Sequence, residues 1–363
     1  MPLPGLAALD HPSPLRGAGR RESVVLGQSW GDRVDTERMR RLVWQAEGAA
    51  GRAVLRVGDG AEPVARAGEA IVRMTRAAVD GLHPGDAGVV AGREMVGVVA
   101  SVADAARGVG AAMVGKRVVV SPLVACGACD LCRGGLSTHC RERKELGATR
   151  DGTLAERVSV PLANLVEIPK ELDDDRAAFA VPLGAALHAA SLAKLEGKVF
   201  VTVIGDSLEA VLAAQVMAQR NASVRLLGRR PHRMSVCEKW GVKHRHIDEA
   251  GRRADQDLVL SFSGSDVDLD VALRLARPRA TVVLAERVAW TSAREALVPL
   301  REGEMTLIGA RGVRLAEAVA LLAGGGIDVM ALLSGKYAMA KAEGAIAAAS
   351  DASETVWRVL VEA

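Results

Sequence analysis

Residues 198–228, KVFVTVIGDSLEAVLAAQVMAQRNASVRLLG, carry the pattern that decides the fold. The first nine, KVFVTVIGD, are an apolar run of strand length, which is typical of a strand buried on both faces. LEAVLAAQVMAQR at 208–220 repeats its apolar residues at helical spacing, and SVRLLG at 223–228 is a second strand. Two strands joined by a helix form a βαβ unit, so the sequence predicts an α/β fold with a parallel, doubly wound sheet.

The same alternation continues toward the C-terminus, and a different pattern precedes it. Further strands are expected at DLVLSF, ATVVLAE, MTLIGA and WRVLVE, which begin at positions 257, 280, 305 and 357, with a helix at 267–276. From about 40 to 170, short apolar runs are separated by Gly, Pro and Asp, which predicts a compact β-rich barrel or sandwich. Residues 1–38 are rich in Pro, Gly and Arg without a steady period, so we expect a flexible N-terminal extension.

The composition limits the possible functions. The chain has 363 residues, 49% of them hydrophobic, and its 47 basic and 44 acidic residues give a formal net charge of +3. This charge provides no strong field toward nucleic acid, and the few aromatic residues (Phe 3, Tyr 1, Trp 5) do not make a base-stacking surface. No window supplies the roughly 20 apolar residues of a membrane span, and the Pro-rich start lacks the apolar core of a signal peptide. We expect a cytoplasmic protein with no nucleic-acid or membrane partner.

Four of the five cysteines lie close together, at Cys126, Cys129, Cys132 and Cys140. The two-residue gaps let successive sulfurs face one centre, and four thiolates complete a closed tetrahedral shell around a zinc ion. Such a zinc site is structural because it leaves no open position for a substrate. In a reducing compartment, metal binding is favoured over disulfides. An iron–sulfur cluster uses the same four thiolates and stays open as an alternative, as do four free cysteines.

The cysteine run and its surroundings resemble a known family. VACGACDLCRGGLSTHC at 124–140, GREMVGVV at 92–99 and DGTLAERVSVPLANLVEIP at 151–169 look like the zinc-type medium-chain dehydrogenase/reductases of the alcohol dehydrogenase superfamily. Threonine- and glucose-dehydrogenase-like members are the most similar. The resemblance covers roughly position 39 to the C-terminus and implies a homodimer or homotetramer. It also implies two domains, a GroES-like β-rich catalytic domain at 39–183 and 313–363 and an inserted Rossmann domain at 184–312.

The turn after the first strand of the βαβ unit is the place of the dinucleotide fingerprint G-x-G-x-x-G. Gly205 keeps the first glycine, while Ser207 and Ala210 stand at the second and third positions. Both replacements are small, so the turn can survive with poorer access for a phosphate. Glu209 lies at the start of the helix, where a carboxylate would repel the pyrophosphate of a bound cofactor.

Two arginines follow the second strand of the unit. An acidic residue at this place serves NAD, whereas an arginine accommodates the 2′-phosphate of NADP. Arg229 and Arg230 therefore favour NADP(H) over NAD(H), with a solvated basic loop as the alternative. The candidate cofactor-binding residues are Gly205, Asp206, Ser207, Ala210, Arg229 and Arg230.

The resemblance also implies a second, catalytic zinc ion, but other residues stand at its ligand positions. Asp80 replaces the family's cysteine, Arg93 its histidine and Val181 its third ligand, while Leu82 stands at the position of the Ser/Thr proton relay. Arginine does not ligate zinc and valine has no donor atom, so the usual three-ligand site should not assemble.

These replacements suggest a different chemistry. We hypothesise that Asp80 and Arg93 form an ion pair across the cleft, with Glu94 orienting Arg93. Arg93 would then be a fixed cation that polarises a carbonyl group, as electrostatic stabilisers do. Arg93, Asp80 and Glu94 are the candidate catalytic residues. An inert ion pair that seals a dead site is one alternative, and a metal ion held by the oxygens of Asp80 and Glu94 is another.

Together these features predict an oxidoreductase that transfers a hydride between NAD(P)(H) and a small alcohol or carbonyl substrate. One structural zinc ion is expected and no catalytic one. The alternative is a catalytically inactive homologue that acts as a binding or interaction subunit.

Overall fold

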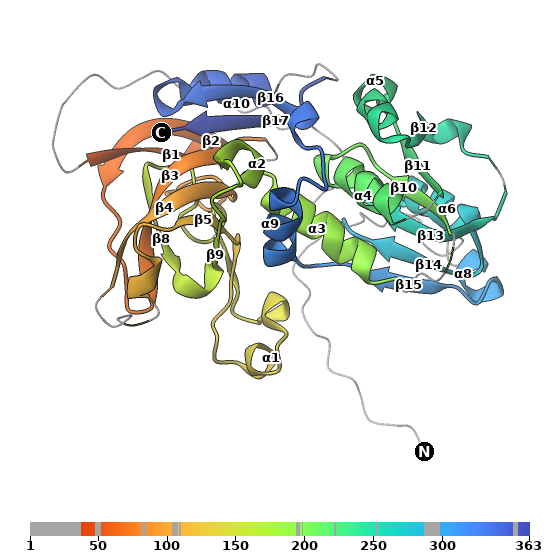
Figure 1. Ribbon diagram of the computed structural model, residues 1–363, viewed down its shortest axis with the longest axis horizontal. Coiled ribbons are helices and arrows are strands. Elements are labelled where there is room, and N and C mark those ends of the chain that lie inside the picture. The colour runs from red at the N-terminus through yellow and green to blue at the C-terminus, as the bar shows by residue number, and fades with distance from the viewer. Residues whose placement is uncertain are drawn as a thin grey trace.

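The computed structural model describes residues 38–47, 52–80, 82, 85–103, 108, 110–193, 197, 199–220, 223–251, 253–286, 298–350 and 355–363. The predicted N-terminal extension lies outside these residues except for position 38. Two sheets stand side by side, with α3 (Ala180–Ser191) and α9 (Leu315–Ala323) between them (Figure 1). The predicted domain boundary after residue 183 falls inside α3.

A seven-stranded sheet forms the β-rich part. Its strands lie in the order β16-β17-β3-β4-β5-β9, with β8 paired to β3. Apolar side chains alternate along β3 with the period of two that a half-buried strand requires. Because β17 pairs antiparallel with β3, the last strand of the chain returns to this sheet. The elements of this part are β3 (Glu69–Ala78), β4 (Met95–Val102), β5 (Arg117–Val120), β8 (Arg157–Pro161), β9 (Leu165–Glu167), α2 (Asp174–Ala177), β16 (Leu333–Ala338), α10 (Ala342–Ser350) and β17 (Arg358–Glu362).

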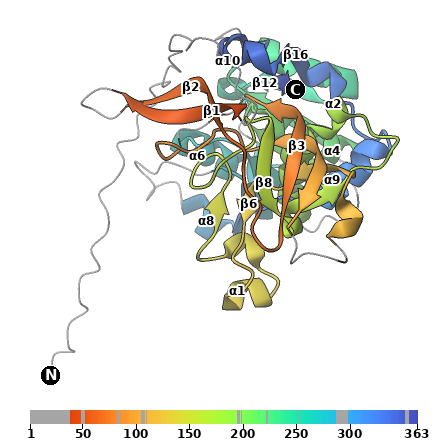
Figure 2. The same ribbon diagram turned by 90° about the vertical axis from the view of Figure 1, so that its left-hand side faces the viewer.

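Two small additions extend from this sheet. The hairpin of β1 (Arg38–Glu47) and β2 (Arg52–Ala61) reaches away from it (Figure 2). A short ladder of β6 (Leu123–Val124) and β7 (Lys144–Glu145) closes the lobe that contains α1 (Asp130–Arg133). This lobe projects from the lower edge of the molecule in both views and carries the four cysteines.

The second sheet has six parallel strands in the order β12-β11-β10-β13-β14-β15. The order reverses at β10, which is the doubly wound arrangement of dinucleotide-binding folds. The predicted fold class, a β-rich part plus an α/β part with a parallel sheet, is confirmed. The elements are β10 (Phe200–Ile204), α4 (Leu208–Gln219), β11 (Ser223–Gly228), α5 (Pro231–Met234), β12 (Lys243–His246), β13 (Gln256–Ser261), α6 (Asp266–Leu275), β14 (Ala276–Leu284), α8 (Val298–Glu302) and β15 (Thr306–Gly309).

Several strands differ from the sequence-based expectation, and two of these differences have a plain physical reason. β12 was not expected because KHRH contains no apolar residue, but it lies at the edge of the sheet, where polar side chains remain exposed. The apolar run RVVVSPLV at 117–124 is divided between β5 and β6 because Pro122 lacks the N–H that a continuous ladder needs. No helix among the described residues is long and apolar enough to cross a membrane.

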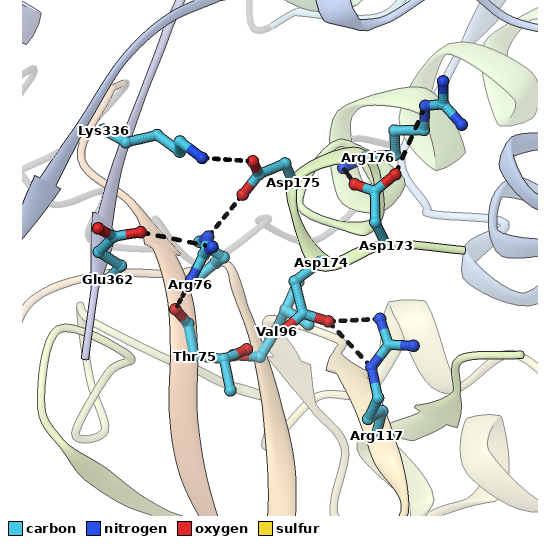
Figure 3. A network of polar contacts seen from close by, with 10 residues as sticks. All are labelled: Thr75, Arg76, Val96, Arg117, Asp173, Asp174, Asp175, Arg176, Lys336 and Glu362. Carbon is cyan, nitrogen blue, oxygen red and sulfur yellow. Dashed lines mark hydrogen bonds and ion pairs between the residues drawn. The ribbon is translucent and has the colours of Figure 1, made fainter. Parts of the chain in front are cut away.

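Consecutive aspartates attach α2 to the first sheet (Figure 3). Asp174 accepts a hydrogen bond from Arg117 Nε of β5 at 3.0 Å. Asp175 accepts from Arg76 Nε of β3 at 2.6 Å and from Lys336 Nζ of β16 at 2.7 Å. Burial opposes ionisation of Asp175, but these two cations outweigh it and lower the pKa of the carboxyl group. The position of α2 is therefore fixed by three different strands.

Three glycines bring backbone segments into direct contact just before β4. A Cβ atom on Gly152 would lie 2.1 Å from the carbonyl oxygen of Gly92, and one on Gly147 would lie 2.4 Å from the same oxygen. Gly92 has a φ of +93°, which side chains other than glycine rarely allow. This corner holds the backbone that leads into Arg93 and Glu94.

We expect Gly152→Ala to lower the free energy of unfolding by ~1–3 kcal/mol, the usual cost of an added atom in a packed place. Urea denaturation followed by circular dichroism measures the change. Gly58→Ala is the matched control, because a Cβ atom there has nothing within 4 Å. Equal stability of the two variants would contradict the close packing of this corner.

Candidate active site

A buried guanidinium group joins the two carboxylates of the expected catalytic centre. Arg358 is 2% exposed, and its Nη2 lies 3.2 Å from Asp80 Oδ2 while Nη1 lies 2.6 Å from Glu94 Oε2. Nη1 also donates to the carbonyl oxygen of Ala178 at 2.8 Å. The backbone N–H of Val359 donates to the other oxygen of Asp80 at 3.1 Å. One cation thus connects β17 with the end of β3, the start of β4 and the end of α2.

The expected ion pair between Asp80 and Arg93 is wrong. Asp80 pairs with Arg358, and the Nη2 of Arg93 lies instead 3.6 Å from Oε2 of Glu145. Glu94 likewise binds Arg358 and does not orient Arg93. The physical reason is burial: a guanidinium group in the interior must be paired, so Arg358 takes the interior carboxylates. Arg93 is 36% exposed and pairs at the surface.

Glu94 titrates near neutral pH in this setting. Burial raises its pKa to about 7; Arg358 opposes this shift, whereas the carboxylates of Asp80 and Glu209 add to it. The same carboxylates outweigh burial at Arg358 and raise the pKa of its guanidinium group, which stays charged. The site therefore contains one permanent cation and one carboxyl group that can gain or lose a proton near pH 7.

The described donors do not make a zinc site at this place. Both oxygens of Asp80 and one oxygen of Glu94 are engaged by β17. Val181 is buried in α3, and Leu82 packs against the apolar core of the β-rich part. Within the described ranges, the four cysteines are the one group of at least three His, Cys, Asp or Glu side chains placed to hold a metal ion. The suggested metal site at Asp80 and Glu94 therefore lacks a third ligand there.

The four cysteines converge as a zinc shell requires. Their Sγ atoms all lie within 4.8 Å of one another, with Cys129–Cys132 at 3.5 Å, Cys126–Cys132 at 3.9 Å and Cys129–Cys140 at 4.0 Å. Zn–S bonds of about 2.3 Å in a tetrahedron place the sulfurs about 3.8 Å apart. Backbone hydrogen bonds from Ala128 and from Cys129, the latter at 3.4 Å, lower the pKa of the Cys126 thiol and so favour its thiolate. The cluster therefore fits a zinc ion.

The turn after β10 keeps part of a dinucleotide site. Gly205 has a φ of +124°, and a Cβ atom there would lie 2.9 Å from the carbonyl oxygen of Phe262 after β13. Ser207 caps α4 by accepting the N–H of Ala210 at 3.2 Å, and Ala210 is fully buried. Small residues at these two positions therefore preserve the turn and the packing of α4 against the sheet.

Internal carboxylates engage the two arginines after β11. The guanidinium of Arg230 pairs with Asp206, whose Oδ2 also accepts the backbone N–H groups of Arg229 at 3.0 Å and Arg230 at 3.1 Å. Burial works against ionisation of Asp206, but Arg230 outweighs it and lowers the pKa of the carboxyl group. Arg229 is 48% exposed, pairs with Asp268 and has Asp248 at 3.9 Å. The guanidinium group of Arg229 is therefore exposed beside the turn, whereas that of Arg230 contacts Asp206 in the turn itself.

A further arginine connects the two parts of the molecule. Arg233 of α5 donates a hydrogen bond to the carbonyl oxygen of Val356, and its guanidinium carbon lies 3.9 Å from the ring centroid of Trp357. Burial lowers the pKa of Arg233 to about 10. This contact joins the parallel sheet to the segment that leads into Arg358.

Arg358 and Arg233 were not predicted as site residues, although each stands in a sequence context that could have indicated a role. Arg358 interrupts the apolar run WRVLVE, and a charge inside a buried strand needs a partner. Arg233 belongs to the basic stretch for which a solvated loop was the alternative to cofactor binding. Their partners come from distant parts of the chain, which no local pattern shows: the carboxylates of Asp80 and Glu94 for Arg358, and Val356 and Trp357 for Arg233.

Comparison with known protein families gives one match. Residues 66–170 match the alcohol dehydrogenase GroES-like domain. An L-threonine 3-dehydrogenase from Mesorhizobium japonicum is 33% identical over 189 residues, which are 52% of this chain and 53% of that protein. The chain thus spans about half the length of the threonine dehydrogenases it matches.

Solved structures match over nearly the whole chain. A thermostable alcohol dehydrogenase from Pyrobaculum aerophilum is 25% identical with a TM-score of 0.76, covering 90% of this chain and 100% of that one. A zinc-binding dehydrogenase structure from Sinorhizobium meliloti 1021, bound to NADP, is 22% identical with a TM-score of 0.76, covering 90% and 99%.

We expect the purified protein to contain about one zinc ion per chain, because the described donors supply one four-sulfur shell. Cys140→Ser should reduce the zinc content and lower the melting temperature. Elemental analysis and calorimetry measure both quantities. Cys237→Ala, which alters a buried thiol outside the cluster, should keep the zinc. A second zinc ion, or iron in place of zinc, would contradict this assignment.

Proposed function

Because the chain belongs to the alcohol dehydrogenase superfamily of medium-chain dehydrogenase/reductases, we propose that it is an oxidoreductase that works without a catalytic zinc ion. It transfers a hydride between a nicotinamide cofactor and an alcohol or carbonyl group of a small molecule. One observation carries the zinc-free mechanism: the buried guanidinium of Arg358 lies between Asp80 and Glu94. A zinc ion and this guanidinium have the same sign of charge and would compete for the same carboxylates.

Glu94 is the group that handles the proton in this mechanism. In alcohol oxidation the hydroxyl proton passes to its carboxylate as the hydride leaves the carbon, and carbonyl reduction reverses both transfers. A pKa of about 7 suits both directions, since general acid–base catalysis is most effective when the pKa of the catalytic group lies near the working pH. Arg358 holds the Glu94 carboxyl group in place through Oε2, at 2.6 Å.

The turn after β10 would hold the nicotinamide cofactor. Gly205 permits the turn, and the buried Ala210 permits close packing of α4. When bound, the cofactor supplies or accepts the hydride. Arg229 supports NADP(H) over NAD(H), because its half-exposed guanidinium follows β11, where a 2′-phosphate would lie.

One observation favours the alternative of a catalytically inactive homologue. Glu209 lies in the first turn of α4, where a dinucleotide fold binds pyrophosphate. Its charge acts on Glu94, Arg233 and Arg358, so the carboxylate lies within electrostatic reach of both parts of the molecule. A carboxylate there repels a pyrophosphate and weakens cofactor binding.

A cytoplasmic location and a homodimeric or homotetrameric assembly are part of the same proposal and rest on the resemblance to the family. Size-exclusion chromatography with light scattering tests the assembly.

Calorimetric titration with NADPH and with NADH tests cofactor binding. We expect NADPH to bind more tightly, and Arg229→Gln to weaken NADPH about tenfold while leaving NADH unchanged, since one charged contact is lost. Glu209→Gln should strengthen both cofactors, because it removes the repulsion. Arg274→Gln is the matched control, since Arg274 forms an exposed ion pair with Asp270 on α6. Failure of both cofactors to bind the wild type and Glu209→Gln would contradict the oxidoreductase and favour the inactive homologue.

The pH dependence of turnover tests Glu94. Carbonyl reduction needs the protonated carboxyl group, so its rate should fall as the pH rises through about 7, and alcohol oxidation should slow as the pH falls through the same value. We expect Glu94→Gln to remove this dependence and to reduce turnover by about 10²–10⁴-fold. Glu317→Gln, which alters an exposed glutamate paired with Arg314, is the control. An unchanged pH profile in Glu94→Gln would assign the proton to another group.

A further inference from the structure

Two arginines from different sheets converge on one carboxylate. Glu145 ends β7 at the base of the cysteine lobe, Arg93 precedes β4, and Arg311 follows β15 of the parallel sheet. The Nη2 of Arg93 lies 3.6 Å from Glu145 Oε2, and the Nη2 of Arg311 lies 3.2 Å from Oε1. Each guanidinium approaches a different oxygen, so the carboxylate bridges the two sheets.

This cluster has one positive charge in excess. Two guanidinium groups share one carboxylate, and all three side chains are partly exposed, at 36% for Arg93, 43% for Arg311 and 29% for Glu145. A guanidinium has five N–H donors. The contact of Arg93 is longer than a hydrogen bond, and Arg311 donates to Glu145 through Nη2. A second monoanion would neutralise the cluster, whereas a dianion would leave it negative.

The cluster lies beside the proposed proton-handling group. Arg93 is the neighbour of Glu94 in the chain, and its charge lowers the pKa of the Glu94 carboxyl group. The loop that carries Arg311 packs against α3, since a Cβ atom on Gly312 would lie 3.1 Å from Nε2 of His188. An anion on the two arginines would therefore be held by a fixed loop, within electrostatic reach of Glu94.

We infer that Arg93 and Arg311 form a recognition site for the carboxylate group of the substrate, which is then a hydroxy acid or keto acid. This inference rests on the proposed function and names its substrate class. Glu145 shows that the pair accepts a carboxylate, and arginine matches that group through paired N–H donors. The substrate carboxylate binds the two cations beside Glu145, and its hydroxyl or carbonyl carbon lies toward Glu94.

Binding of lactate without any cofactor tests the site independently of turnover. Titration calorimetry compares lactate with lactamide, its uncharged counterpart, and with inorganic phosphate. We expect lactate to bind and lactamide not to bind, with phosphate weaker than lactate. Arg93→Gln and Arg311→Gln should each weaken lactate about tenfold, the effect of one lost charged contact. Arg274→Gln should bind lactate like the wild type.

If an arginine variant fails to fold, Glu145→Gln provides a second test of the carboxylate site. Removing this carboxylate frees both cations, so lactate binding should strengthen several-fold. No lactate binding to the wild type and Glu145→Gln, equal binding of lactamide, or preference for phosphate would overturn the carboxylate site. Titration of the same variants with NADPH separates this outcome from failure of the proposed function, because cofactor binding does not require Arg93 or Arg311.

Discussion

The site depends on the burial of one positive charge, the guanidinium group of Arg358. A buried charge is stable only when opposite charges and hydrogen bonds surround it, and removal of one partner costs several kcal/mol, roughly 3–5. Here Asp80, Glu94 and the carbonyl of Ala178 meet that need from three separate segments. The loss of any one of these groups is costly, because it leaves part of the positive charge or an N–H donor of Arg358 without a partner in the interior. The arrangement of β17, β3 and β4 around this point follows from that requirement.

In the proposed mechanism the contacts of Arg358 with Asp80 and Glu94 have two consequences. They keep a metal ion from these carboxylates, and they leave Glu94 as an acid–base group. A zinc ion activates an alcohol by lowering the pKa of a bound oxygen. A guanidinium group has no empty coordination position and cannot do this, but it leaves Glu94 close to another carboxylate and largely removed from water. These conditions bring the pKa of Glu94 to about 7. In the proposed mechanism the proton therefore passes to a side-chain carboxyl group and not to or from a metal-bound oxygen.

Local patterns in the sequence were sufficient for the fold but not for the site. The βαβ unit at 198–228 and the spacing of the cysteines depend on neighbouring residues, so they could be predicted. Glu94 and Arg358 are 264 positions apart, and the sequence alone does not connect them. Asp80 was paired instead with Arg93, because both stand at positions where the family has zinc ligands. Arg229 and Arg230 were predicted to favour NADP(H) or to form a solvated loop, and the sequence did not show that Asp268 and Asp206 engage them in the folded chain. Charge pairing across strands depends on sheet order, which residue types alone do not contain.

Trp357 lies at the junction of the two parts of the molecule, 6% exposed and covered by the guanidinium group of Arg233. The tryptophan belongs to the segment that leads into β17, whereas Arg233 belongs to the parallel-sheet part. Any hinge movement between these parts separates the cation from the indole ring and admits water to it. The fluorescence emission of an indole changes with its surroundings, so the emission of Trp357 would report opening and closing of the two parts.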